Sequence, residues 1–321
     1  MLALAFASGA AALQLQHTSV PPGRHATETL LDWFSGSGAK GEVSSAIAPG
    51  ISAICGQGLV ATRTLRLNEL LLVAPLDTAC MHAEAALADP DIGKNARQCV
   101  DHCGLTASVE ALVTAALLAH ARHSHDSEAA RRWGPYVDSL PWGCGDETDP
   151  LKEHPIHVGD ERLGPRVAQS RSAARAVREL LDGGVDEEIC LRAIVLVASR
   201  AFNLQLRNFD GDSPPQDGRL RAVMCPVLDL ANHPSFTLLG RSGAVGERFR
   251  TLKSPLHGVI RPKYNGDSRE LKVYGPSHLE VSAGDELWAW YSHAGCYETT
   301  AEARRNGEQA FLAQYGFSPW D

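Results

Sequence analysis

The order of strand-like and helical segments constrains the fold of this chain of 321 residues more than any single motif does. Strand-like runs lie between about residues 47 and 80, helix-period patterns fill a stretch of about 81–185, and strand-like runs return after residue 222. A doubly wound fold needs strands and helices in regular alternation, because each parallel strand joins the next through a helix. The order therefore predicts an α+β fold, in which a small antiparallel β-fold is interrupted by a helical insert.

The first strand-like region contains two closely spaced glycines. In "ISAICGQGLVATRTLRLNELLLVAP", two β-rich runs are joined by Gly56, Gln57 and Gly58. A dinucleotide fingerprint would need a third glycine and a helix N-terminus that faces the phosphates, but "LVATRTL" continues as a strand. We therefore interpret residues 56–58 as a turn at which backbone groups approach a ligand closely, with a plain glycine-rich hairpin as the alternative.

Three helical zones are recognisable in the middle of the chain. From Ser108, residues recur at the spacing of one helix face, namely Val109, Leu112, Val113, Ala116, Leu117 and His120. A second zone, "SRSAARAVRELLDGG", ends at Gly183 and Gly184. A third begins at Asp186, with acidic residues where the helix dipole favours them, and runs through "ICLRAIVLVASRAF".

Composition excludes some classes of partner. Hydrophobic residues make up 44% of the chain and the formal net charge is -8, so we expect a full core and no nucleic-acid partner. The eight cysteines have no paired spacing, which is typical of free thiols in a reducing intracellular compartment such as the cytoplasm, nucleus or plastid. Cys99, His102 and Cys103 form the closest cluster, but no second pair follows at zinc-finger spacing, so we expect no metal site.

The N-terminal segment 1–27 begins with "MLALAFASGAAALQLQ". It is apolar but too short to span a bilayer, and its small residues resemble a cleavage region. We interpret it as a targeting segment or a disordered one. No other stretch reaches transmembrane length, so we expect no membrane contact in the mature form.

A polar cluster follows the apolar run "VMCPVLDL", which predicts a buried strand that includes Asp229. Asp229, Asn232 and His233 lie within five residues of one another, directly before a proline. These residue types are compatible with a metal site, with half of a catalytic triad, or with a plain exit from strand to loop. The cluster alone does not choose among these three interpretations.

Several stretches resemble a known family when they are taken in order. They are "GQGLVATRTLRLNELLLVAP", "WGPYVDSLP", "ASRAF", "PVLDLANH", "AGDELWAWY" and "NGEQAFLAQYGF". Their order resembles that of SET-domain methyltransferases, and more narrowly that of the branch which includes the Rubisco large-subunit lysine methyltransferase. The resemblance covers about residues 28–321. It implies a SET-domain β-fold with a pseudoknot, split by the helical insert, and a C-terminal SET part from about 186 to 321.

The resemblance implies a binding site for S-adenosylmethionine. Asn232 and His233 match the pair that contacts this cofactor at the pseudoknot. The 56–58 segment matches the part that packs against the methionine end of the cofactor through main-chain groups. Arg200 is expected to pair with the cofactor carboxylate, for which a guanidinium fork is well shaped.

The resemblance also assigns residues to the chemistry and to the substrate. Tyr291 is the expected catalytic residue and also contacts the cofactor, because an in-line methyl transfer needs alignment of the methyl group and the amine more than covalent assistance. Tyr315 and Phe317 match the aromatic pair that flanks the amine channel, and Asp229 helps line the substrate side. Phe202 matches an asparagine of a related histidine methyltransferase, and its apolar ring favours lysine as the target.

We therefore expect a protein-lysine N-methyltransferase that acts on a lysine-bearing protein substrate. Three alternatives stay open at this point. They are a protein-histidine methyltransferase of the same branch, a catalytically silent SET-type binding scaffold, and a zinc-dependent hydrolase built from the Cys and His clusters.

Overall fold

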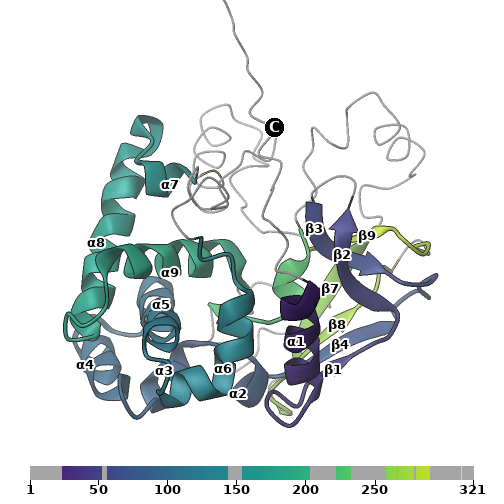
Figure 1. The fold of residues 1–321 in the computed structure, drawn as a ribbon, viewed down its shortest axis with the longest axis horizontal. Coiled ribbons are helices and arrows are strands. Elements are labelled where there is room, and N and C mark those ends of the chain that lie inside the picture. The colour runs from purple at the N-terminus through teal and green to yellow at the C-terminus, as the bar shows by residue number, and fades with distance from the viewer. Residues whose placement is uncertain are drawn as a thin grey trace, which may run out of the picture.

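A computed structural model describes residues 24–52, 56–143, 154–202, 222–232, 258–265, 267–277, 280–289 and Leu312. Helices and strands lie in two adjoining parts, with most helices at the left of Figure 1 and the strands at the right. Helix α1 (Arg24–Ser35) packs against both parts, since it contacts α6 and β1. The arrangement confirms the predicted α+β class.

Seven strands form one sheet in the order β1-β4-β8-β7-β9-β3-β2. Its pairs are antiparallel except for β7 and β9, which pair parallel, and a second small sheet pairs β5 with β6. The mostly antiparallel sheet confirms the predicted β-fold. The strands span β1 Glu42–Val43, β2 Ile47–Ser52, β3 Gly56–Ala61, β4 Leu70–Pro75, β5 Ala201–Phe202, β6 Val223–Met224, β7 Val259–Asn265, β8 Glu270–Tyr274 and β9 Glu286–Ala289.

Alternation of side chains along the strands builds the core of the sheet. In β8, Leu271 and Val273 are buried while their neighbours are partly exposed, because successive side chains point to opposite faces. Strand β9 is buried at all four positions, as expected of an inner strand that is covered on both faces. Each fully buried Leu or Val side chain contributes about 1.5–3 kcal/mol, so β9 is held firmly in place.

The helical part is built around α5 (Ala107–His123), which is buried on most sides and packs against α3, α6, α8 and α9. The Thr106 side chain caps α5 by accepting a hydrogen bond from Val109 N. In the part of the chain that the structure describes, no helix is both long and apolar enough to cross a bilayer. The other helices span α2 Leu76–Ala79, α3 Ala83–Ala88, α4 Gly93–Cys103, α6 Glu128–Ser139, α7 Pro155–Val158, η1 Glu161–Leu163, α8 Gly164–Leu180 and α9 Glu187–Arg200.

Local signals mark the helix ends where they were predicted. The Asp186 side chain caps α9 by accepting a hydrogen bond from Glu188 N at 2.7 Å. Gly183 follows α8 with a φ of +73°, a left-handed conformation that favours glycine. The buried side chains of α9 belong to the same core as those of α5 and α8, so α9 packs with the helical part.

Two local predictions are wrong. Residues 56–58 are not a turn but the start of β3, in which Gly58 pairs with Gly50 of β2. The run "VMCPVLDL" is not one strand, because β6 ends at Met224 and Pro226 has no N–H to donate to a sheet. Val227 then has a φ of +69°, and Asp229 lies in the short helix η3 (Leu228–Leu230).

Candidate active site

The backbone of Asn232 runs alongside β9. Its carbonyl oxygen accepts a hydrogen bond from Ala289 N at 2.9 Å, and Asn232 forms a parallel bridge with Trp288. Strand β3 pairs with the first half of β9, at Leu59 and Val60. Asn232 therefore pairs with the second half of β9, where β3 no longer pairs. This places Asn232 beside the N-terminal half of β3.

Gly58 lies against the side chains of Asn232 and Glu286. A Cβ atom at position 58 would lie 2.8 Å from Glu286 Oε1 and 2.9 Å from Asn232 Nδ2, which is closer than real Cβ atoms approach such atoms. Asn232 Nδ2 donates a hydrogen bond to Glu286 Oε1 at 2.8 Å, and Glu286 is only 8% exposed. Close approach of these two side chains, and not backbone conformation, therefore favours glycine at this position.

A buried polar network lies three positions upstream of Asn232. Arg200, at the end of α9, donates from Nη1 to the carbonyl oxygen of Asp229 at 3.2 Å, and the same nitrogen lies 3.7 Å from Asp229 Oδ2. The Tyr136 hydroxyl, on α6, donates to Asp229 Oδ2 at 2.7 Å. The side chain of Asp229 is 1% exposed and that of Arg200 is 24% exposed, so the carboxylate is shielded from solvent while part of the arginine side chain is not.

The protonation states in this network follow from burial. Burial raises the pKa of Asp229, while the charge of Arg200 and the hydrogen bond from Tyr136 act in the opposite direction. Burial, with the Asp229 carboxylate second, raises the pKa of the Tyr136 phenol well above its ordinary value. Tyr136 therefore keeps its proton at neutral pH and acts as the hydrogen-bond donor to Asp229.

The structure brings several of the predicted site residues together. Gly58 contacts Asn232, and Arg200 contacts Asp229, so the 229–232 segment joins the two groups. Gly56 and Gln57 precede Gly58 in β3, where they pair with Ser52 and Ile51 of β2. Phe202 is 4% exposed and belongs to the core of the sheet.

Other predicted residues lie outside the part of the chain that the structure describes. They are His233, Tyr291, Tyr315 and Phe317, together with the side chain of Gln57. The role of each remains a prediction, as do the roles of Asp229 and Phe202 toward a substrate.

Sequence reasoning missed two residues that contact the site, Tyr136 and Glu286. Tyr136 is fully buried, and a buried phenol usually hydrogen-bonds to a partner. The tyrosine in "WGPYVDSLP" could therefore have indicated a buried hydrogen bond, but not its partner. Glu286 stands among apolar residues in "DELWAW", which is typical of a buried acid with a dedicated donor. The partners themselves lie far away in sequence, so neither contact could be derived from local pattern.

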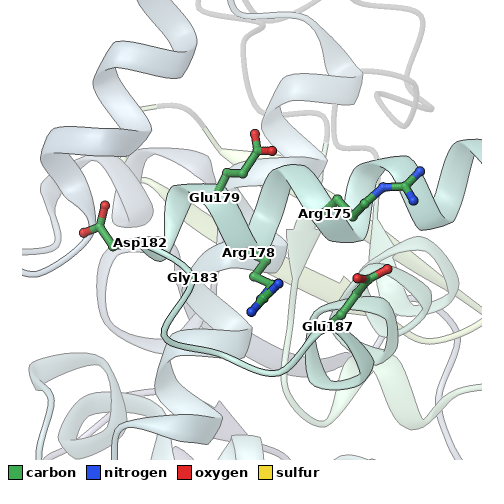
Figure 2. Close-up of a pocket in the computed structure, with 6 residues that line it drawn as sticks. All are labelled: Arg175, Arg178, Glu179, Asp182, Gly183 and Glu187. Carbon is green, nitrogen blue, oxygen red and sulfur yellow. The ribbon is translucent and has the colours of Figure 1, made fainter.

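A pocket of about 380 Å³ lies at the corner between α8 and α9, apart from this site. Figure 2 shows that charged side chains of both signs surround it. None of its lining residues is a predicted site residue, and none belongs to the network around Asp229. The lining residues are Arg175, Arg178, Glu179, Asp182, Gly183 and Glu187.

Asp89, Asp91 and His120 place one ligand atom each within 4.8 Å of one another. Asp89 Oδ1 accepts hydrogen bonds from the backbone N–H groups of Asp91 and Ile92, and His120 Nε2 lies 3.2 Å from Asp91 Oδ2. The Asp89 side chain thus stabilises the turn that leads into α4, and His120 pairs with Asp91 beside it.

The fold is that of a SET domain, because solved SET domains match it over nearly its whole length. The SET domain of LSMT bound to lysine and AdoHcy matches with a TM-score of 0.57 and 17% sequence identity, over 92% of this chain and 57% of that chain. The SET domain of LSMT bound to methyl-lysine and AdoHcy matches with a TM-score of 0.54 and 18% identity, over 91% of this chain and 56% of that chain.

This chain thus spans less than three fifths of the LSMT chains that it resembles. No family model matches the chain, and no curated protein matches it. The similarity of the solved structures therefore establishes the fold. The element order of this chain shows the predicted split, since α2 to α9 lie between β4 and β7 of the same sheet.

Proposed function

We propose that the chain is a protein-lysine N-methyltransferase that uses S-adenosylmethionine as its methyl donor. The observation that carries the proposal is the contact of Gly58 with Asn232, beside the point where Asn232 bridges to β9. The LSMT domains of the same fold are bound to AdoHcy together with lysine or methyl-lysine. AdoHcy is S-adenosylmethionine without its transferable methyl group, which supports this donor and a lysine-bearing protein substrate.

The described residues fit the cofactor in two respects. The side chains of Asn232 and Glu286 fill the space that a side chain at position 58 would take, so the backbone of β3 lies directly beside Asn232. Part of the Arg200 side chain is exposed, and a guanidinium fork matches a carboxylate. In the proposed arrangement Asn232 and His233 contact the adenine edge, residues 56–58 contact the methionine end, and Arg200 pairs with the carboxylate.

When bound, S-adenosylmethionine supplies a methyl group on a sulfonium, which is activated for displacement by an amine. The chain's own task is to align the amine and to exclude water. We propose that the Tyr291 hydroxyl holds the methyl group and the amine, while Tyr315 and Phe317 form the walls of the amine channel. Deprotonating a lysine of unperturbed pKa about 10.4 costs about 4–5 kcal/mol at pH 7, and desolvation in an apolar channel lowers that cost.

The choice of lysine over histidine rests on Phe202. Its side chain is 4% exposed and lies in an apolar core with Val223 and Cys225. A phenyl ring has no donor or acceptor with which to orient a neutral imidazole. The ring keeps its surroundings apolar, which suits the methylene groups of lysine, whose amine alone needs polar contact.

The test is methyl transfer from labelled S-adenosylmethionine into proteins of a lysate of the source cells. We expect at least one labelled protein band that depends on the enzyme and disappears when the enzyme is heat-denatured. Titration with AdoHcy in the same preparation measures cofactor binding separately from transfer. A protein that binds no AdoHcy and labels no band contradicts the proposal and favours a silent scaffold.

A further inference from the structure

The hydroxyl of Tyr136 links the helical part to the candidate cofactor site. Tyr136 lies on α6 in the helical insert, whereas Asp229 lies 93 positions later, in η3 of the SET part. We propose that Tyr136 is a positioning residue, which holds the Asp229 carboxylate and thereby sets the orientation of the Arg200 guanidinium. This inference rests on the proposed function, because it assigns Arg200 to the cofactor carboxylate.

The geometry gives Tyr136 a rigid position. Its side chain is fully buried, and α6 packs against α1 and α5. Trp33 Nε1, on α1, donates a hydrogen bond to the carbonyl oxygen of Arg132, one turn before Tyr136. Since both neighbouring helices fix α6, the phenol oxygen is a fixed point from which a hydrogen bond of 2.7 Å reaches Asp229.

Asp229 transmits this position to Arg200. The carboxylate is 1% exposed, so water does not compete effectively for its oxygens, and its orientation depends on Tyr136 and Arg200. Arg200 Nη1 contacts both the carbonyl oxygen and Oδ2 of Asp229. With one nitrogen held in this way, the planar guanidinium has a defined orientation, and among the described residues no hydrogen bond uses its Nε or Nη2 atoms.

The partial exposure of Arg200 completes the argument. A guanidinium that served only to neutralise Asp229 would be expected to be as buried as its partner, but its side chain is 24% exposed while that of Asp229 is 1% exposed. This partial exposure leaves room for the remaining donors to meet an anionic ligand group. The strength of a carboxylate–guanidinium pair depends on the orientation of the guanidinium plane. In the proposal Tyr136 sets this orientation through Asp229.

The experiment compares Tyr136→Phe, Asp229→Asn and the double variant by calorimetric titration with AdoHcy. We expect Tyr136→Phe to weaken AdoHcy binding about tenfold. The double variant should bind no more than about twofold more weakly than Asp229→Asn alone, because the hydroxyl acts through the carboxylate. The matched control is Tyr274→Phe in β8, whose phenol makes no hydrogen bond among the described residues, and its dissociation constant should stay within twofold of the wild-type value.

A split between steady-state constants separates positioning from simple stabilisation. Since Arg200 is assigned to the cofactor carboxylate and not to the methyl group, Tyr136→Phe should raise KM for S-adenosylmethionine about tenfold and change kcat less than threefold. A purely structural role would lower the free energy of unfolding and leave the dissociation constant of the folded protein unchanged. That result, or additive effects in the double variant, overturns the inference.

The outcomes also distinguish the inference from the proposed function. If the wild-type protein binds no AdoHcy, both are wrong. If Arg200→Ala weakens binding but Tyr136→Phe does not, the inference alone is wrong. Should Tyr136→Phe fail to fold, Asp229→Asn alters the hydrogen bond between Tyr136 and Asp229 at the acceptor. An unchanged dissociation constant of Asp229→Asn for AdoHcy then overturns the inference by itself.

Discussion

Gly58→Ala tests whether close packing around Asn232 builds the candidate site. The added methyl group would lie 2.8 Å from Glu286 Oε1 and 2.9 Å from Asn232 Nδ2. These two atoms form a hydrogen bond of 2.8 Å with each other, so the methyl group must push apart a bonded pair. Overpacking costs about 1–3 kcal/mol, and the lost hydrogen bond costs about 1 kcal/mol more. We therefore expect a loss of about 2–4 kcal/mol in the free energy of unfolding.

The variant should also lose cofactor affinity, because Asn232 is displaced from its place beside β3. Urea unfolding measures the stability change, and titration with AdoHcy should give a dissociation constant at least tenfold higher than that of the wild type. Gly184→Ala is the matched control, since its added Cβ meets only Leu181 O at 3.5 Å, and we expect a change within about 0.5 kcal/mol. Wild-type stability and affinity in Gly58→Ala would refute the packing argument.

Three further predictions concern single side chains. Asn232→Ala should abolish measurable AdoHcy binding and cost about 1–3 kcal/mol of stability, because buried Glu286 loses a donor; an unchanged dissociation constant in calorimetry contradicts the assignment. Tyr291→Phe should bind AdoHcy normally but transfer methyl groups far more slowly, and near-normal turnover in a labelling assay means that another group holds the methyl. Burial lowers the pKa of His82 from 6.5 to about 4, so the unfolded chain takes up the proton first as pH falls below 6.5. Urea unfolding should therefore show a loss of about 2 kcal/mol between pH 7.5 and pH 5, which His82→Gln removes, whereas an equal loss in the variant shows that other groups are responsible.

Local signals in the sequence were enough to predict α5, the end of α8 and the start of α9, but not every helix. The Asp186 cap, the stripe that begins at Val109 and the glycines after α8 act over one or two turns, so they do not depend on the rest of the fold. The order of strands and helices was likewise sufficient for the α+β class. The SET-domain fold itself came from the ordered resemblance of separated stretches.

The errors and omissions have physical causes of longer range. The sequence predicts a turn at residues 56–58 because glycine adopts turn conformations easily. The pairing of β3 with β2 decides their conformation instead. The break after Met224 depends in part on Pro226, a local signal that the apolar pattern outweighed, and in part on the positive φ of Val227, which that pattern does not reveal. The bond between Tyr136 and Asp229 joins residues 93 positions apart, so only the tertiary structure could supply it.

The central claim, methyl transfer to lysine, is tested most directly by the chemical identity of the methylated amino acid. A protein labelled by the enzyme from methyl-labelled S-adenosylmethionine is hydrolysed in acid, and its amino acids are separated with methyl-lysine and methylhistidine as standards. The account predicts that the label is recovered as methyl-lysine, because the apolar ring of Phe202 suits a lysine chain. Label recovered as methylhistidine, with none as methyl-lysine, would contradict it.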